Sequence, residues 1–168
     1  MEGNSLRIII TGILTTSMLM WGCPVFLHGD GIHVALSHHF FHANIFHLAV
    51  NSMSVWLLFR KGYRYETAPL IVAFICATIS WYCSAADVVG FSNIIFAIVG
   101  LRTPSLSSSW WRQPATVMFF AVTLLMAFLP QVSAVTHLVS FVLGCLYAAA
   151  HRIITSISRD YARASYHK

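Results

Sequence analysis

Residues 88–101 read VVGFSNIIFAIVGL and lie between two charged residues, Asp87 and Arg102. These 14 residues contain no Asp, Glu, Lys or Arg, and a helix of that length is about 21 Å long. The hydrocarbon core of a bilayer is about 30 Å thick. A helix in this stretch is therefore too short to cross a membrane from surface to surface, and we expect its start, near Ser92, to lie below the surface.

The composition of the chain indicates a membrane protein. Of its 168 residues, 58% are hydrophobic and 9% are charged, and the mean hydropathy is +0.73. An ordinary soluble domain is about 25% charged, so this chain lacks the polar residues that cover a surface facing water. The formal net charge is +5, but the basic residues are too few and too scattered to form a phosphate-binding face, and we expect no nucleic-acid partner.

The charged residues divide the chain into uncharged stretches that suit membrane-spanning helices, because a charge near the middle of a bilayer is costly. Pro130 interrupts the longest of these stretches, and a proline there favours a turn between two helices. We therefore expect one all-α polytopic membrane domain over residues 1–168, a bundle of six transmembrane helices with a short central fourth helix. The expected spans are approximately 6–21, 43–59, 67–84, 92–108, 114–130 and 133–151.

The positions of lysine and arginine predict the orientation of these spans. With six spans, all ten basic residues fall on the same side of the membrane, and lysine and arginine are enriched in cytoplasmic loops. Both termini are therefore expected in the cytoplasm, where residues 152–168 form a basic tail. We expect that tail to be a solvated helix end, with binding to lipid head groups as the less favoured alternative.

Two features of the N-terminal half leave alternatives open. Residues 6–23 have the length of a secretory signal peptide, but Trp21 stands where a small residue is expected before a cleavage site, so we favour a retained first span. Cys23 and Cys83 both fall near the expected outer side and could pair. Cysteines in so apolar a chain are more often buried as small hydrophobic residues.

Polar side chains recur at one depth in three of the expected spans. His47 and Asn51 are four residues apart and so share one face of the second span. Ser92 begins the fourth span, and His137 lies about 9 Å along the sixth, counted from Gln131. Polar residues inside a membrane indicate a functional site, and all four are expected in the outer half of the bilayer.

The chemistry of these side chains indicates nucleophilic catalysis by serine. A serine hydroxyl becomes nucleophilic when a base, most often histidine, accepts its proton. A side-chain amide, an imidazole and backbone N–H groups at a helix start can donate hydrogen bonds to the oxyanion that forms. Gly90 allows the backbone to approach Ser92 closely. No carboxylate is expected at the depth of His137 unless the loop with Asp87 dips into the membrane, so we expect a dyad and not a triad.

These residues resemble the motifs of the rhomboid intramembrane serine proteases, and the resemblance covers nearly the whole chain. Six spans with both termini inside is the compact bacterial topology of that family. Three stretches carry the resemblance: Gly90-Phe91-Ser92-Asn93, the set His42, His47 and Asn51 at the spacing H-x-x-x-x-H-x-x-x-N, and Thr136-His137 followed by Ser140 and Gly144.

The resemblance implies a role for each of the central residues. Ser92 is expected to be the nucleophile and His137 the general base. His47, Asn51 and the backbone N–H of Ser92 are expected to form the oxyanion hole. Phe96, one turn after Ser92, is expected to pack against His137, where the family usually has a tyrosine. The expected supporting residues are Gly90, Asn93, Phe96, His42, Ser140 and Gly144.

The resemblance also implies the substrate and the location. The expected substrate is a transmembrane protein with a single span, cleaved near the outer interface of a bacterial cytoplasmic membrane. The lipid bilayer is the only other expected partner, and no cofactor or metal is required. Nothing in the sequence predicts the oligomeric state.

The chain departs from the family pattern at four places. Asn93 replaces the glycine after the nucleophile, Ser140 replaces a glycine that packs the fourth span against the sixth, and Thr136 replaces an alanine. Serine is small enough for such packing, whereas Asn93 either narrows the site or adds a hydrogen-bond donor to it. The outer loop 22–42 lacks the family's arginine and carries five histidines instead, which we expect to be exposed: His28, His33, His38, His39 and His42.

Two alternative functions follow from these departures. An inactive rhomboid relative that binds membrane clients without cleaving them is the first alternative, although such relatives usually lose the serine or the histidine and both are present here. A histidine-loop metal transporter is the second and less favoured alternative, since the loop has no acidic cluster. The H-E-x-x-H pattern of a membrane zinc protease is absent from the sequence.

Overall fold

The structure, a computed structural model, describes residues 2–21, 31–59, 67–83, 89–103, 121 and 133–166. Across these ranges the chain is helical and no β-strand is formed. The described elements are α1 (Gly3–Trp21), α2 (Ile32–Ser37), the 3-10 helix η1 (His38–Phe40), α3 (Ile45–Leu58), α4 (Thr67–Tyr82), α5 (Ser92–Arg102) and α8 (Ala134–Tyr166).

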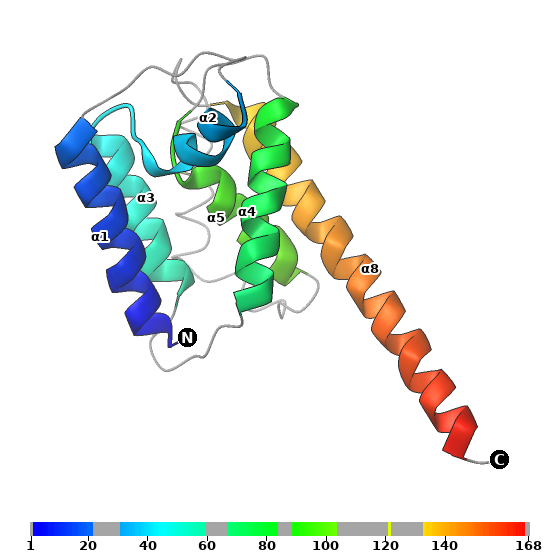
Figure 1. The fold of residues 1–168 in the computed structure, drawn as a ribbon. Helices are drawn as coiled ribbons and strands as arrows, with labels where there is room; N and C mark the ends of the chain where they lie inside the picture. Colours follow the sequence, from blue (N-terminus) through cyan, green and yellow to red (C-terminus); the bar gives the residue numbers. More distant parts are fainter. Residues whose placement is uncertain are drawn as a thin grey trace.

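Helix α5 lies at the centre of the described helices, in contact with α3, α4 and α8 (Figure 1). Every residue of α5 from 93 to 100 is buried. A helix that is apolar on all sides is stable only where other helices surround it, which explains the central position of this segment. Helices α1 and α4 run in one direction and α3, α5 and α8 in the other, so the last three all begin at the same end (Figure 1).

Two glycines allow α5 and α8 to meet backbone against backbone. A Cβ atom on Gly100 would collide with the carbonyl oxygen of Phe141, and one on Gly144 would collide with the carbonyl oxygen of Ala97. Small residues at a helix interface permit this closeness and are typical of helix packing in membranes. Gly144, which we expected to be a supporting residue, thus lies at the contact between these two helices.

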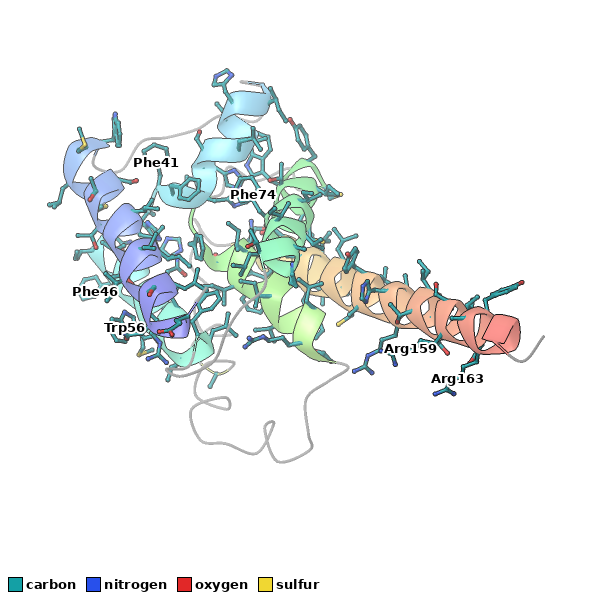
Figure 2. All side chains as sticks on the ribbon, turned by 60° about the horizontal axis from the view of Figure 1, so that its bottom comes forward. Phe41, Phe46, Trp56, Phe74, Arg159 and Arg163 are labelled. Atoms are coloured by element: carbon teal, nitrogen blue, oxygen red, sulfur yellow. The ribbon has the colours of Figure 1, made fainter. Side chains whose placement is uncertain are left out.

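The described helices bury polar side chains beside an apolar core, and they also expose many large apolar side chains. Leu19, Phe46 and Leu138 are exposed on α1, α3 and α8, whereas His39 and Ser80 are completely buried. Figure 2 shows Phe46 and Trp56 on α3. Soluble proteins rarely expose so much contiguous apolar surface, so this distribution suits a protein surrounded by lipid.

The described helices overlap five of the six expected spans. By length and composition, one of them can cross a membrane, over Ala134–Arg163. The helices α3, α4 and α5 are apolar but have only 14, 16 and 11 residues. Six full-length spans are therefore not shown, and the expected fifth span, 114–130, lies outside the described residues except for residue 121, which is helical.

The last described helix continues well beyond the expected end of the sixth span. We expected that span to end at residue 151, but α8 continues to Tyr166 through most of the basic tail. A helix can continue beyond the membrane surface where no residue breaks it, and residues 152–166 contain neither proline nor glycine. Arg159 and Arg163 lie on the part of α8 that extends away from the other helices (Figure 2).

Basic side chains join three helix ends at one end of the bundle. The guanidinium of Arg7 in α1 lies 5.3 Å from the centre of the Trp56 ring near the end of α3. Arg102, at the end of α5, donates a hydrogen bond of 3.1 Å to the carbonyl oxygen of Leu58, the last residue of α3. The two chain termini lie toward this same end (Figure 1).

We predict that Gly144→Ala destabilises the protein by about 1–3 kcal/mol, the usual cost of overpacking a tight interface. Its new methyl group would meet the backbone of α5, which cannot move without shifting the whole helix. Thermal unfolding of the purified protein in detergent measures the effect. Gly12→Ala in α1 is the matched control because no atom lies within 4 Å of its added Cβ. Equal melting temperatures for the two variants would contradict the close contact.

Candidate active site

The side chains of Ser92 and His137 meet where α5 and α8 begin. The distance between Ser92 Oγ and His137 Nε2 is 2.8 Å, a hydrogen bond between residues 45 positions apart in the sequence. Ser92 is the first residue of α5, and His137 lies in the first turn of α8. The two polar residues that we expected at one depth are thus in direct contact.

Local hydrogen bonds shape the start of α8 around His137. Ser133 Oγ accepts a hydrogen bond from the Thr136 backbone N–H at 3.3 Å, which satisfies a free donor of the first turn. The Thr136 hydroxyl donates to the carbonyl oxygen of Ser133 at 2.9 Å. Thr136, which replaces the family's alanine, is therefore buried with its hydroxyl satisfied.

One face of the His137 ring is covered by Phe96. The two rings stack with their centres 4.6 Å apart and their planes 12° from parallel. Phe96 follows Ser92 by four residues and lies on the same face of α5. The Nδ1 atom of His137 has no hydrogen-bond partner in the part of the chain that the structure describes. Asp87, the carboxylate that precedes Ser92 by five residues, lies outside that part.

Gly90 allows α3 to pack closely against the loop before Ser92. Its φ of +122° lies in a region that residues with a side chain rarely adopt. A Cβ atom here would lie 2.6 Å from His47 Cε1 and 3.2 Å from Asn51 Nδ2, so both side chains occupy the space that a larger residue would need. The N–H of Gly90 donates to the carbonyl oxygen of His38 at 3.0 Å. The loop before Ser92 is thereby held between η1 and α3.

His47 and Asn51 lie on the buried face of α3, one turn apart. Asn44 caps this helix, since its side-chain oxygen accepts a 2.9 Å hydrogen bond from the His47 N–H. The Asn51 Nδ2 donor is buried and has no acceptor among the described residues. A free amide donor beside Gly90 is available to a negatively charged oxygen at this site.

Three histidines of the outer loop are buried, which corrects our expectation that they are exposed. Residues 38–40 turn inward and pack against α4, a partner more than thirty residues later in the chain. His38 stacks on Trp81 with ring centres 5.2 Å apart, and His39 Nε2 lies 3.2 Å from Thr78 Oγ1. The expectation was correct for His33, and His28 lies outside the described residues.

The third buried histidine of the loop is His42, whose ring centre lies 5.2 Å from that of His47. It thus supports His47 from the loop side. Burial, together with the neighbouring His47, lowers the pKa of His42 to about 3, and burial lowers the pKa of His39 well below its ordinary value. Both rings are therefore neutral at neutral pH.

Asn93 and Ser140, which replace family glycines, have different surroundings. Asn93 is buried, and its Oδ1 atom has no hydrogen-bond partner among the residues described. The hydroxyl of Ser140 donates a 2.6 Å hydrogen bond to Ser80 Oγ in α4. Sequence reasoning did not single out Ser80, whose only signal is a hydroxyl in the apolar stretch 67–82.

The cysteines give no support for a disulfide. Cys83 has a free thiol and is exposed, while Cys76 is free and buried. Cys23, the partner that we considered for Cys83, lies outside the described residues. Among the residues that the structure describes, no three side chains of His, Cys, Asp or Glu are arranged to hold a metal ion.

The fold and the site together define an all-helical protein in which a serine and a histidine meet at the buried starts of two helices. Comparison with protein families matches residues 15–153 to the Rhomboid domain, which is most of the chain. The protein therefore belongs to the rhomboid family, whose members are membrane proteins and include intramembrane proteases as well as inactive homologues. No curated protein and no solved structure gives a significant match.

We predict that Gly90→Ala destabilises the protein more than Gly31→Ala does. Both glycines have positive φ, so both variants pay the strain of about 1–3 kcal/mol that such a conformation imposes on alanine. At Gly90 the methyl group also meets His47 at 2.6 Å, whereas at Gly31 the nearest atoms are 3.5 Å away. Chemical or thermal unfolding measures both. An equal loss of stability would show that His47 does not pack against Gly90.

Proposed function

We propose that the protein is an intramembrane serine endopeptidase that cleaves single-span membrane proteins near the outer membrane interface. The observation that carries the proposal is the 2.8 Å contact between Ser92 Oγ and His137 Nε2 in a chain of the rhomboid family. Histidine at hydrogen-bond distance from a serine hydroxyl is the arrangement that activates the serine as a nucleophile.

In the proposed mechanism, His137 Nε2 accepts the Ser92 hydroxyl proton while Ser92 Oγ attacks the carbonyl carbon of the scissile bond. The C–N bond then breaks, and His137 returns the proton to the leaving amine. The acyl group stays on Ser92 until a water molecule, deprotonated by the same histidine, attacks its carbonyl carbon. The bond to Ser92 Oγ then breaks, His137 returns the proton to that oxygen, and the product leaves as a carboxylic acid. The ring Nδ1 needs no carboxylate for these proton transfers, so the pair functions as a dyad.

The negative charge of the tetrahedral intermediate needs hydrogen-bond donors. His47 and Asn51 are the side chains against Gly90, two residues before the nucleophile. The buried Asn51 Nδ2 group has no acceptor among the described residues, so it can donate to the oxyanion without breaking another bond. The backbone N–H of Ser92, at the start of α5, is the third proposed donor.

The proposed orientation has six spans, both termini in the cytoplasm of a bacterium and the site toward the outer side. Arg7 and Arg102 support it, because both lie at the end of the bundle where α3 ends. Ser92 begins α5 at the opposite end of that helix, about 15 Å from Arg102. The basic end would thus face the cytoplasm.

The proposed substrate is a transmembrane segment that unwinds locally. An intact helix keeps its carbonyl groups in hydrogen bonds to the N–H four residues later, so a scissile bond inside it is not presented to Ser92. Helix-weakening residues near the outer interface therefore favour cleavage.

An inactive, client-binding rhomboid relative is the second candidate function. One observation favours it: the buried side chain of Asn93 stands next to the nucleophile where the family pattern has glycine. Labelling of Ser92 by a fluorophosphonate probe distinguishes the two candidates, because only an activated serine reacts with it.

We predict that a fluorophosphonate probe labels the wild-type protein and that Ser92→Ala abolishes labelling. His137→Ala should reduce the labelling rate by about a thousandfold or more, because the hydroxyl loses its base. In-gel fluorescence of the protein in liposomes measures both, and Ser54→Ala, a buried serine bonded within α3, is the control that retains full labelling. Absence of labelling in the wild type would favour the inactive relative.

We predict that Asn51→Ala lowers kcat for a reporter transmembrane substrate by about 10²–10³-fold, the usual cost of removing one oxyanion donor. The KM should change little, since the donor acts on charge that develops in the transition state. Ser52→Ala, one residue further along α3, is the control. A rise in KM at constant kcat would argue for a role in substrate binding instead.

A further inference from the structure

The last turn of α4 contains a hydrogen bond that no catalytic role accounts for. Ser140 Oγ of α8 donates to Ser80 Oγ at 2.6 Å, and Ser80 Oγ donates in turn to the carbonyl oxygen of Ala77 at 2.7 Å. Both serine side chains are completely buried. The two hydroxyls are thus linked in a chain that ends on the backbone of α4.

This hydrogen bond joins α4 to the helix that carries the base. Ser140 follows His137 by three residues, so the two side chains lie near one another on the same side of α8. The contact at Gly144 lets the α5 and α8 axes approach closely, but a glycine contact has no preferred direction. A hydrogen bond has a preferred length and angle, so the Ser80–Ser140 bond also restricts how α8 rotates and slides.

The next residue of the same turn contacts the other half of the site. Trp81 stacks on His38, whose carbonyl oxygen accepts the hydrogen bond of Gly90. Gly90 is two residues before Ser92. Ser80 and Trp81 are consecutive residues of α4. Ser80 contacts α8, which carries His137, and Trp81 contacts η1, which holds the loop before Ser92.

We propose that the Ser80–Ser140 hydrogen bond positions His137 against Ser92, with Ser80 and Ser140 as positioning residues. The effect of this bond on catalysis rests on the proposed proteolytic function. Its effect on the position of the His137 ring does not depend on that function. The family pattern has glycine at position 140, so this bond depends on a residue in which the chain departs from its family.

The test compares Ser80→Ala, Ser140→Ala and the double variant of the full-length protein. Ser80→Ala leaves the buried Ser140 hydroxyl without its acceptor and should lose stability, whereas in Ser140→Ala the Ser80 hydroxyl still donates to the carbonyl oxygen of Ala77 and the loss should be smaller. The double variant should regain part of the stability that Ser80→Ala loses, because no orphaned hydroxyl remains. If the bond positions His137, the site should not recover in the double variant together with the stability. In the double variant the ¹⁵N NMR signal of His137 Nε2, assigned with His137→Ala, stays shifted, and fluorophosphonate labelling stays about tenfold or more below wild type.

A wild-type His137 signal in the double variant would overturn the proposal, because the bond would then be merely structural. The NMR comparison works in an inactive protein as well. Failure of the wild type to label would therefore count against the proposed function alone, while the His137 signal still decides the positioning role. Ser54→Ala is the control for loss of a buried hydroxyl, and Ser140→Gly removes the same bond if Ser80→Ala does not fold.

Discussion

The backbone contact between α5 and α8 is the constraint on which the candidate site depends. Ser92 and His137 lie on different helices, and their 2.8 Å separation exists only while those helices stay in register. Gly100 and Gly144 make that closeness possible, since a side chain at either position would meet the backbone of the other helix. These glycines lie about two turns away from the serine and the histidine, yet the distance between the reactive atoms depends on them.

Around this contact, the described helices bury polar side chains together with the apolar core and expose many large apolar side chains. Histidines, serines and asparagines gather between the helices, while leucine, isoleucine and phenylalanine side chains are exposed. A buried polar group is costly unless it is bonded, and three of the hydrogen bonds that these groups make join elements far apart in the sequence. The polar interior thus connects η1 to α4 through His39 and Thr78, and α4 to α8 through the two serines.

The sequence was most informative where the signal is local. The second and fourth spans were expected to begin at residues 43 and 92, and α3 begins at Ile45 and α5 at Ser92. It was less informative where the partner is distant. The burial of His38 and His39 depends on Trp81 and Thr78, and that of Ser140 on Ser80, sixty residues earlier. The end of α8 could not be predicted from membrane thickness, because a helix stops only where its own residues stop it.

The shared direction of α3, α5 and α8 has an electrostatic consequence. Each α-helix carries a partial positive charge at its N-terminus, where the first backbone N–H groups have no partner within the helix. His47, Ser92 and His137 all lie in the first turn of their respective helices. Three positive helix ends therefore converge on the place where negative charge would develop during acyl transfer, and the backbone itself contributes to the field that favours it.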